Sequence, residues 1–418
     1  MREDISELAR EESFPLASRL ALVGLAMGLL LSSFNISVVN VALPDLANRL
    51  AVSMPAVQWL VVTYLLAMTC LMPMAGWWGD RWGRKPVMLS GICIFSLGTI
   101  GCVLAESLTP LIMARLVQGV GAALMISLAM TFVSDLLPAS KTGLAMGVLG
   151  TTSAVGTALG PVLGGLLITY FHWHALFYVS LPVSILSFLI SARQLPDRRS
   201  VAPSSVPQGH LWHHLRESTG LQRSCGANFL VSAVIMSTMV VGPFYLSDGI
   251  GLTTEQIGLV MAFGPVVAAV TGAPAGKLTD NRGPGFVIRT GLVVMLSGCL
   301  LIALLSIWGL SFPGAAAFGY VVPLVMITAG YAMFQAANNT LVMKNVQEGR
   351  KGVTSALLNL SRNLGLMAGA SVLGWVYLVA MAVAPTGQPQ SVVAFAVTFV
   401  VSAGLVMLAL SGMVRKRT

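Results

Sequence analysis

The stretch from Met74 to Met88 reads M-A-G-W-W-G-D-R-W-G-R-K-P-V-M and lies between two long apolar runs. In a chain of which only 9% of residues are charged, it holds four charged side chains, namely Asp80, Arg81, Arg84 and Lys85. Three glycines leave room for close backbone approach and a tight reversal of the chain, namely Gly76, Gly79 and Gly83. The stretch predicts a short charged turn between two membrane-spanning helices.

The composition indicates a membrane protein. Of 418 residues, 56% are hydrophobic, and the mean hydropathy is +0.83. A soluble protein of this length could not bury so much apolar surface, whereas helices in a lipid bilayer can expose it. Residues 1–18 are polar and acidic, so we expect no cleavable signal peptide. The basic residues behind the net charge of +9 lie in short loops, where they orient a membrane protein in the bilayer. We therefore expect no nucleic-acid partner.

Apolar segments of about 20 residues or more recur twelve times, and each is long enough to cross a bilayer. We therefore predict an all-α membrane protein with twelve transmembrane helices. The predicted spans are 19–43, 55–78, 86–105, 109–134, 142–169, 174–194, 224–247, 255–279, 285–308, 314–341, 352–381 and 388–413.

The loop charges predict the orientation of the chain. If the N-terminus is cytoplasmic, nearly all loop Lys and Arg fall on that side, and Arg49 is the only basic residue in an outer loop. This asymmetry predicts a multi-pass protein of the inner or plasma membrane with both termini in the cytoplasm. The predicted divisions are a cytoplasmic tail (1–18), a six-helix bundle (19–194), a cytoplasmic linker (195–223), a second bundle (224–413) and a second tail (414–418).

The two predicted bundles repeat one another. Three residues of the charged turn recur 200 positions later as Gly276, Asp280 and Gly283. Glycines of the fifth and eleventh spans are also matched, namely Gly156, Gly160 and Gly165 with Gly365, Gly369 and Gly374. Parallel repeats of this kind predict a pseudo-two-fold axis along the membrane normal and a substrate site between the halves near mid-bilayer.

The pattern G-x-x-x-D-R-x-G-R-K from Gly76 to Lys85 resembles the loop between helices two and three of the major facilitator superfamily. The resemblance implies two pseudo-symmetric six-helix bundles that work by alternating access. It also implies a latch that holds the halves together on the cytoplasmic side when the carrier opens outward. The latch residues would be Gly76, Asp80, Arg81, Gly83, Arg84, Lys85 and Asp280. The alternative is an ordinary positive-inside loop.

The fifth span contains G-T-A-L-G-P-V-L-G-G, from Gly156 to Gly165. Its glycines predict a flat face for tight helix packing, and its proline predicts a bend. The segment resembles the antiporter signature of the same superfamily, which implies an exporter. The residues of this motif are Gly156, Gly160, Pro161, Gly164 and Gly165. Simple small-residue packing remains an alternative.

The fourth span contains R-L-V-Q-G-V-G-A-A, and its Arg115 and Gln118 share one helical face. A guanidinium in hydrocarbon needs a cavity, water or a partner. The stretch resembles a superfamily motif whose arginine is linked to proton or substrate coupling. The alternative is that Arg115 extends to the outer membrane surface.

The first span resembles that of proton-coupled drug exporters, which often have an acidic residue at the place of Asn35. An amide can hydrogen-bond a substrate but cannot release a proton near neutral pH. The chain has 15 acidic residues, and none lies in the middle of a predicted span, whereas Arg362 lies inside the eleventh.

We therefore predict a neutral to positive cavity that favours neutral or anionic amphiphiles through Arg115 and Arg362. A purely structural contact of Arg362 is the alternative. Other polar residues expected to bind substrate are Asn40, Tyr64, Asn228, Gln335, Asn338 and Asn339, with Asn35 and Gln118.

The chain has no G-x-x-x-x-G-K-[ST] loop, so we expect an ion gradient to drive transport. The family resemblance implies protons, and Asp45 or Asp248 is the candidate titrating group. The five cysteines are scattered along the sequence. The loop histidines, His210, His213 and His214, have no acidic or Cys partner nearby, so we expect no metal and no cofactor.

We expect a secondary transporter and no enzyme, because no Ser/His pair or metal cluster is placed at membrane depth. The predicted function is proton-coupled export of drugs or small amphiphiles, by a monomer whose partners are the substrate, protons and the bilayer. The alternatives are an exporter of one metabolite or siderophore, and a receptor or scaffold that no longer transports.

Overall fold

The computed structural model describes residues 16–136, 139–197, 219–308, 316–344, 351–384 and 390–414. All the regular structure in these segments is helical. The first half contains α2 (Leu16–Arg49), α3 (Met54–Trp82), α4 (Arg84–Leu104), α5 (Leu108–Leu136), α6 (Ala139–Tyr170), α7 (Ala175–Tyr178) and α8 (Ser180–Gln194). The second half contains α10 (Thr219–Phe244), η1 (Tyr245–Gly249), α11 (Thr254–Arg282), α12 (Pro284–Trp308), α13 (Ala316–Lys344), α14 (Lys351–Ala368), η5 (Gly369–Leu373), α15 (Gly374–Val383) and α16 (Gln390–Val414).

These elements make twelve crossings. Within the described segments, eleven helical runs are long and apolar enough to span a membrane. The twelfth is α6, whose apolar part is Val155–Tyr170. Each predicted span coincides with an observed helical run, and no predicted end is more than six residues from the observed one, the widest gap being 43 against Arg49. The domain boundaries, including the linker at 195–223, stay predictions.

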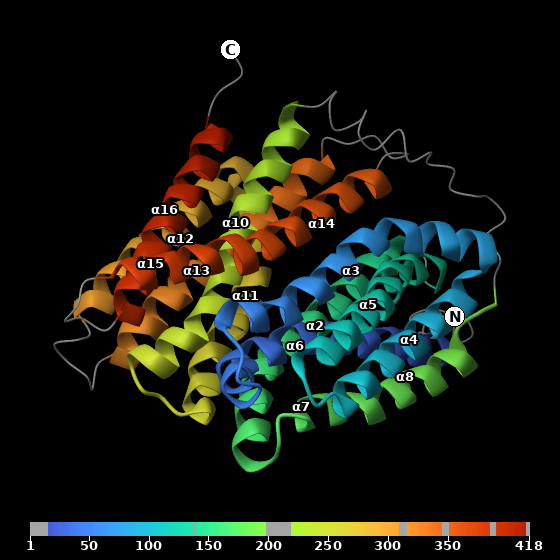
Figure 1. The fold of residues 1–418 in the computed structure, drawn as a ribbon. Helices are drawn as coiled ribbons and strands as arrows, with labels where there is room; N and C mark the ends of the chain where they lie inside the picture. Colours follow the sequence, from blue (N-terminus) through green and yellow to red (C-terminus); the bar gives the residue numbers. More distant parts are fainter. Residues whose placement is uncertain are drawn as a thin grey trace, which may run out of the picture.

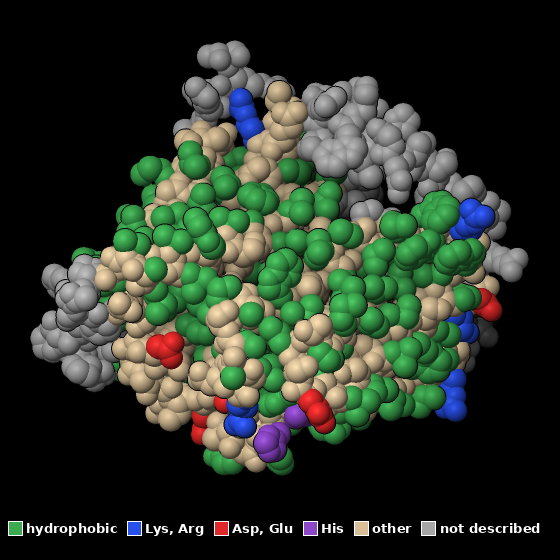
Figure 2. Space-filling view, viewed as in Figure 1, with side chains coloured by type: hydrophobic (Ala, Val, Ile, Leu, Met, Phe, Trp, Pro, Cys, Tyr) green, Lys and Arg blue, Asp and Glu red, His purple; other side chains and the backbone are tan. Residues whose placement is uncertain are grey.

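The helices gather in two bundles, and α6 and α11 make the largest contact between them. Figure 1 shows the blue to green helices of the first half grouped apart from the yellow to red helices of the second half. In the space-filling view, apolar side chains cover most of the face across both groups, while the charged ones lie toward its edges (Figure 2). This surface suits a hydrocarbon solvent and defines a multi-pass membrane protein.

Local sequence fixes the helix ends. The charged turn from α3 to α4 passes through Gly83 at φ +96°, and the matching turn from α11 to α12 passes through Gly283 at φ +81°. Only glycine adopts such angles without strain. At its other end α11 begins with a capping box, in which Thr253 and Gln256 exchange side-chain to backbone hydrogen bonds of 3.1 and 3.4 Å.

The turns define two ends of the molecule. We call the end with Gly83 and Gly283, where α8 also stops and α10 starts, the linker face. The opposite end carries the connections at residues 50–53, 105–107, 171–174 and 250–253, and we call it the far face.

The predicted repeat appears in the packing. Cβ atoms added at Gly156 and Gly160 of α6 would lie 2.6 Å from the Leu30 carbonyl and 2.7 Å from Ser37 Cβ, both on α2. Cβ atoms added at the matching Gly365 and Gly369 would lie 2.2 Å from carbonyls of α10, the helix equivalent to α2. The fifth and eleventh crossings therefore lie against the first and seventh in the same way, as a pseudo-two-fold relation requires.

Candidate functional site

A cavity of about 310 Å³ lies between the two bundles. Two helices of the first bundle line it, α2 and α6, and four of the second, α10, α11, α13 and α14. A cavity shared by both halves has the place predicted from the repeat, and its size is within the usual range for small-molecule sites.

The first bundle lines the cavity mainly with small hydroxyl groups. Ser33 of α2 and Ser153 of α6 lie with their Oγ atoms 2.6 Å apart, in a hydrogen bond that ties the two helices together. Thr157, one turn along α6, donates to the Ser153 carbonyl oxygen at 3.0 Å. This wall can donate to and accept from hydroxyl, carbonyl or acidic groups of a ligand.

The second bundle contributes a larger, mostly apolar wall. Its thioether side chains are Met236, Met239 and Met261. The hydroxyl of Tyr320 donates to the Thr238 carbonyl oxygen at 3.2 Å, while Tyr331 accepts a hydrogen bond from Gln335 Nε2 at 3.0 Å. Aromatic rings and flexible thioethers together suit a flat apolar molecule.

Arg362 of α14 is the only charged side chain among the described residues that line the cavity. It follows Lys351, the first residue of α14, by eleven positions, so it lies about 16 Å along the helix axis. The apolar span of this helix begins at Leu357, so Arg362 lies about 8 Å inside it. The cavity is therefore neutral to positive within the described part, as predicted.

Arg115 is buried inside the first bundle and does not line the cavity. Its Nε donates to the Leu60 carbonyl oxygen and its Nη2 to the Asn35 carbonyl oxygen, each at 3.1 Å. Its Nη1 donates to Gln118 Oε1, and the guanidinium carbon lies 4.3 Å from the ring centre of Tyr64. With 1% of its surface exposed, Arg115 does not extend to the membrane surface, so that alternative is wrong.

Amides and hydroxyls complete the network around this arginine. Gln118 Nε2 donates to Asn35 Oδ1 at 3.1 Å and to Thr99 Oγ1 at 2.8 Å. Asn35 Nδ2 in turn donates to Ser180 Oγ at 3.0 Å. The structure thus brings together four predicted site residues, Asn35, Tyr64, Arg115 and Gln118, away from the cavity. Their part in coupling stays a prediction.

The other predicted polar residues are not among the residues that line the cavity. Asn40 is buried and approaches Met239 Sδ at 3.9 Å. Asn228 Nδ2 donates to the Leu358 carbonyl oxygen at 2.8 Å and so ties α10 to α14. Asn338 is buried without a hydrogen bond in the described part of the chain, and Asn339 is exposed.

Sequence reasoning missed most of the lining residues. The hydroxyls of Ser153 and Thr157 are four positions apart, and the thioethers of Met236 and Met239 are three apart, so each pair shares one helix face. This spacing was the available signal. It was weak because Ser, Thr and Met are common at helix contacts in membranes.

Two tight helix crossings lie between the cavity and the far face. A Cβ atom at Gly258 of α11 would lie 2.4 Å from the Pro161 carbonyl oxygen of α6, and one at Gly165 would lie 2.8 Å from the Thr254 carbonyl oxygen. In the equivalent crossing, a Cβ atom at Gly374 would lie 2.5 Å from the side-chain amide of Gln58 on α3. The motif glycine at position 164 lies against α2, because a Cβ atom at Gly164 would be 3.1 Å from Val38.

The linker face carries the predicted latch. The side chain of Asp80 lies outside the described residues, whereas Asp280 is exposed. Arg81 lies 5.3 Å above the ring of Trp77. Gly76 has open space around it. The latch, with Arg84 and Lys85, stays a prediction.

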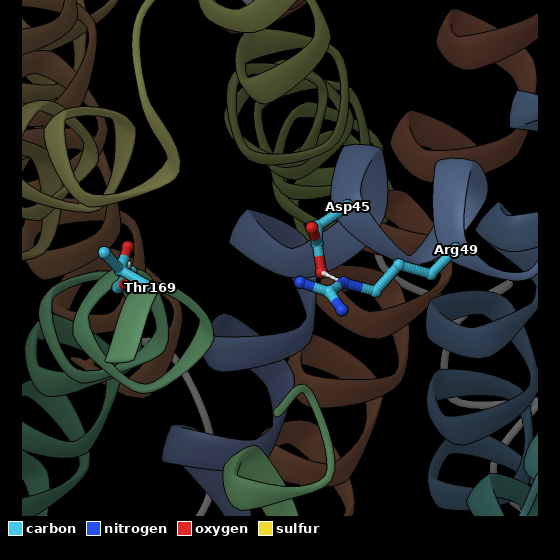
Figure 3. Close-up of polar contacts among 4 residues, drawn as sticks. Asp45, Arg49 and Thr169 are labelled. Carbon is cyan, nitrogen blue, oxygen red and sulfur yellow. Dashed lines mark hydrogen bonds and ion pairs between the residues drawn. The ribbon is translucent and has the colours of Figure 1, made fainter. Parts of the chain in front are cut away.

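The candidate titrating groups lie near the far face. Asp45 Oδ2 accepts a hydrogen bond from Arg49 Nε at 2.7 Å in an ion pair one turn apart, drawn with Thr169 in Figure 3. Asp248 is exposed. Within the described segments no group of three His, Cys, Asp or Glu could hold a metal ion, while the loop histidines, His210, His213 and His214, lie outside them.

Two transporters illustrate the sequence relatives. The riboflavin transporter RibZ of Clostridioides difficile strain 630 is 24% identical over 400 residues, which cover 84% of this chain and 86% of RibZ. The putative multidrug resistance protein MdtD of Yersinia enterocolitica is 28% identical over 406 residues, which cover 84% of each chain.

Solved structures share the fold. The crystal structure of a bacterial homologue of the human lysosomal transporter Spinster, inward-facing and unoccupied, matches with a TM-score of 0.77 at 18% identity and covers 97% of this chain and 99% of that one. A mutant of the nucleoside transporter NupG matches with a TM-score of 0.74 at 13% identity, and the match covers 96% of this chain and 100% of that one. Residues 25–370 also match the family model of the Major Facilitator Superfamily. The chain therefore belongs to the Major Facilitator Superfamily of membrane transporters.

Proposed function

We propose that this transporter exports small neutral or anionic amphiphiles across a bacterial inner membrane by alternating access. One observation carries the proposal: a cavity between the bundles whose described lining combines hydroxyls, thioethers, tyrosines and a single guanidinium, that of Arg362. The antiporter motif at Gly156 to Gly165 and the name of MdtD support export. The loop charges support a cytoplasmic linker face and cytoplasmic termini.

A second candidate is export of one specific metabolite. The hydrogen-bonded pair of Ser33 and Ser153 supports it, because fixed hydroxyls select for polar groups at matching positions. RibZ is an example of a relative that is named for a single substrate, riboflavin. The methionines support the broader pump, because thioethers adapt to many shapes.

The test is flux through proteoliposomes that contain the purified chain. We expect wild-type vesicles to move at least one member of a panel of riboflavin, naphthalene-2-sulfonate and ethidium faster than protein-free vesicles. Movement of riboflavin alone would favour the specific exporter. Rates no higher than in protein-free vesicles for the whole panel would contradict a transport function.

The latch gives a further prediction. We expect Asp80→Asn to shift the population toward the state that is open at the linker face, because the carboxylate beside the helix end and its basic neighbours would no longer hold the halves together. The measurement is labelling of a cysteine at Thr328, in the cavity, by an impermeant thiol reagent. Unchanged labelling from either side would remove the latch, and Asp280→Asn in the equivalent turn is the matched comparison.

A further inference from the structure

We propose that the substrate is an organic monoanion whose negative group pairs with Arg362, and that the membrane potential alone drives its export. This inference rests on the proposed function and names both the substrate class and the driving force. In place of proton antiport, each cycle would carry one net negative charge out of the cell.

The first step concerns the charge on Arg362. A guanidinium stays protonated in proteins, and a charge at membrane depth is costly unless it is paired or hydrated. Within the described residues Arg362 makes no hydrogen bond or ion pair, and the cavity lining offers it no carboxylate. When the cavity closes around a ligand and loses water, the counter-charge has to come from the ligand.

The second step concerns the acidic residues of the whole sequence. Every one of the 15 lies outside the described helices or within four residues of a helix end. Asp45, the deepest of them, precedes the end of α2 by four positions and is paired with Arg49. At the place where proton-coupled relatives often carry an acid, Asn35 instead binds Ser180 and Gln118. Among the described residues, no carboxylate is therefore placed to exchange a proton with the cavity.

The third step concerns the energy. A bacterial inner membrane is negative inside, so the potential favours the outward movement of an anion. A monovalent anion at equilibrium with about 100 mV is concentrated about fifty-fold on the outside. The loaded carrier moves with Arg362 neutralised, and the empty carrier returns with its positive charge, so one negative charge crosses per cycle.

The side chains that line the cavity indicate which organic anions are substrates. The apolar wall with Met239, Tyr320 and Tyr331 faces a flat ring system, while Ser33 and Ser153 can receive its polar substituents. We therefore expect aromatic sulfonates or carboxylates to be substrates, and matched cations to be excluded by Arg362.

The experiment uses three probes with one ring system: naphthalene-2-sulfonate, naphthalene-2-sulfonamide and trimethyl(2-naphthyl)ammonium. Their charges do not depend on pH between 5 and 8. Wild-type proteoliposomes receive either a potassium diffusion potential with equal pH on both sides or a pH gradient with the potential held at zero. We expect only the sulfonate to accumulate against its gradient, about fifty-fold at about 100 mV, and only in response to the potential.

Variants test the role of the arginine. We expect Arg362→Gln to lower sulfonate flux by about ten- to a hundredfold without lowering sulfonamide flux, and Arg362→Lys to restore part of it. The control is Arg289→Gln, which removes an exposed charge from α12 outside the cavity and should change neither flux. If Arg362 had only a structural role, Arg362→Gln would lower the sulfonate and sulfonamide fluxes together.

Several results would overturn the inference while the transport function stands. These are accumulation of the cation, accumulation of the sulfonate in response to the pH gradient alone, and loss of accumulation but not binding in Asp45→Asn or Asp248→Asn. If none of the three probes moves faster through wild-type proteoliposomes than through protein-free vesicles, the proposed function fails as well.

Discussion

Gly258→Val is expected to lower transport by up to about a hundredfold, because the new side chain prevents closure at the far face. A Cβ atom at this position would lie 2.4 Å from the Pro161 carbonyl oxygen and 3.1 Å from Gly165 Cα, both backbone atoms of α6. Backbone cannot rotate away, so α11 and α6 have to separate. Overpacking costs about 1–3 kcal/mol, which lowers the population of the closed state by up to about a hundredfold.

The matched control is Gly272→Val on the same helix. A Cβ atom at Gly272 would have no neighbouring atom within 4 Å, so this variant carries the same change in helix propensity without the overlap. The measurement is substrate flux, together with labelling from the far face of a cysteine at Thr238, a cavity residue, in a protein without its native cysteines. We expect labelling to rise in the Gly258 variant and to stay unchanged in the control.

Wild-type flux in both variants would show that the tight crossing of α6 and α11 is not required in the cycle. A loss in both would point to a general defect of α11. The second crossing offers a milder version of the test. There Gln58 stands at the position equivalent to Gly258, 200 residues earlier, and a side-chain amide rather than backbone faces Gly374. Gly374→Ala should therefore lower transport less than Gly258→Val.

The twelve crossings were predictable because the bilayer allows few alternatives. A segment that spans hydrocarbon must satisfy its backbone internally and must be about 20 residues long, so length and apolarity define it. The largest error, at the end of α2, has a clear reason. The helix continues through Pro44 and Asp45 to Arg49, because the ion pair between these last two residues lies within one helical turn.

The repeat was also predictable, down to particular glycines. Gly365, Gly369 and Gly374 were matched to Gly156, Gly160 and Gly165 from sequence alone, and each set packs its helix on equivalent partners. Glycine is informative here because only a missing side chain allows two helix backbones to approach so closely. A position that needs no side chain leaves the same signal in both halves.

The cavity lining was not predictable in the same way. Of ten residues proposed to bind substrate, only Arg362 lines the described cavity. Gln118 instead accepts a hydrogen bond from the buried Arg115 and donates one to the side chain of Asn35. Helices that are apolar all round give no periodic signal for the face that meets the partner bundle, so small hydroxyls such as Ser153 could not be told from packing residues.

Arg115 and Arg362 therefore have different surroundings. Arg115 is fully enclosed and donates to two carbonyls and one amide oxygen. Arg362 lies on the cavity wall, exposed. Arg115 is a buried cation held by neutral hydrogen-bond acceptors and by the ring face of Tyr64, so the stability of the protein depends on each of these contacts. Gln118 is the acceptor that can be removed without changing the backbone.

We expect Gln118→Leu to lower the free energy of unfolding by about 1.5–3 kcal/mol, because it leaves the Arg115 guanidinium buried without one of its acceptors. The same change removes the donor to Asn35 Oδ1 and Thr99 Oγ1. The measurement is unfolding in mixed detergent micelles, and Gln390→Leu at the exposed start of α16 is the control, with an expected change within about 0.5 kcal/mol.

Adding Arg115→Met should recover much of this loss, since an apolar side chain of similar length removes the buried charge itself. The double variant also separates the two roles of the arginine. If Arg115 only holds the first bundle together, a stable double variant transports; if it couples substrate or proton movement, as the family motif implies, the double variant folds and transport is lost. A double variant no more stable than Gln118→Leu would contradict the assignment of this network as a buried charge held by neutral acceptors.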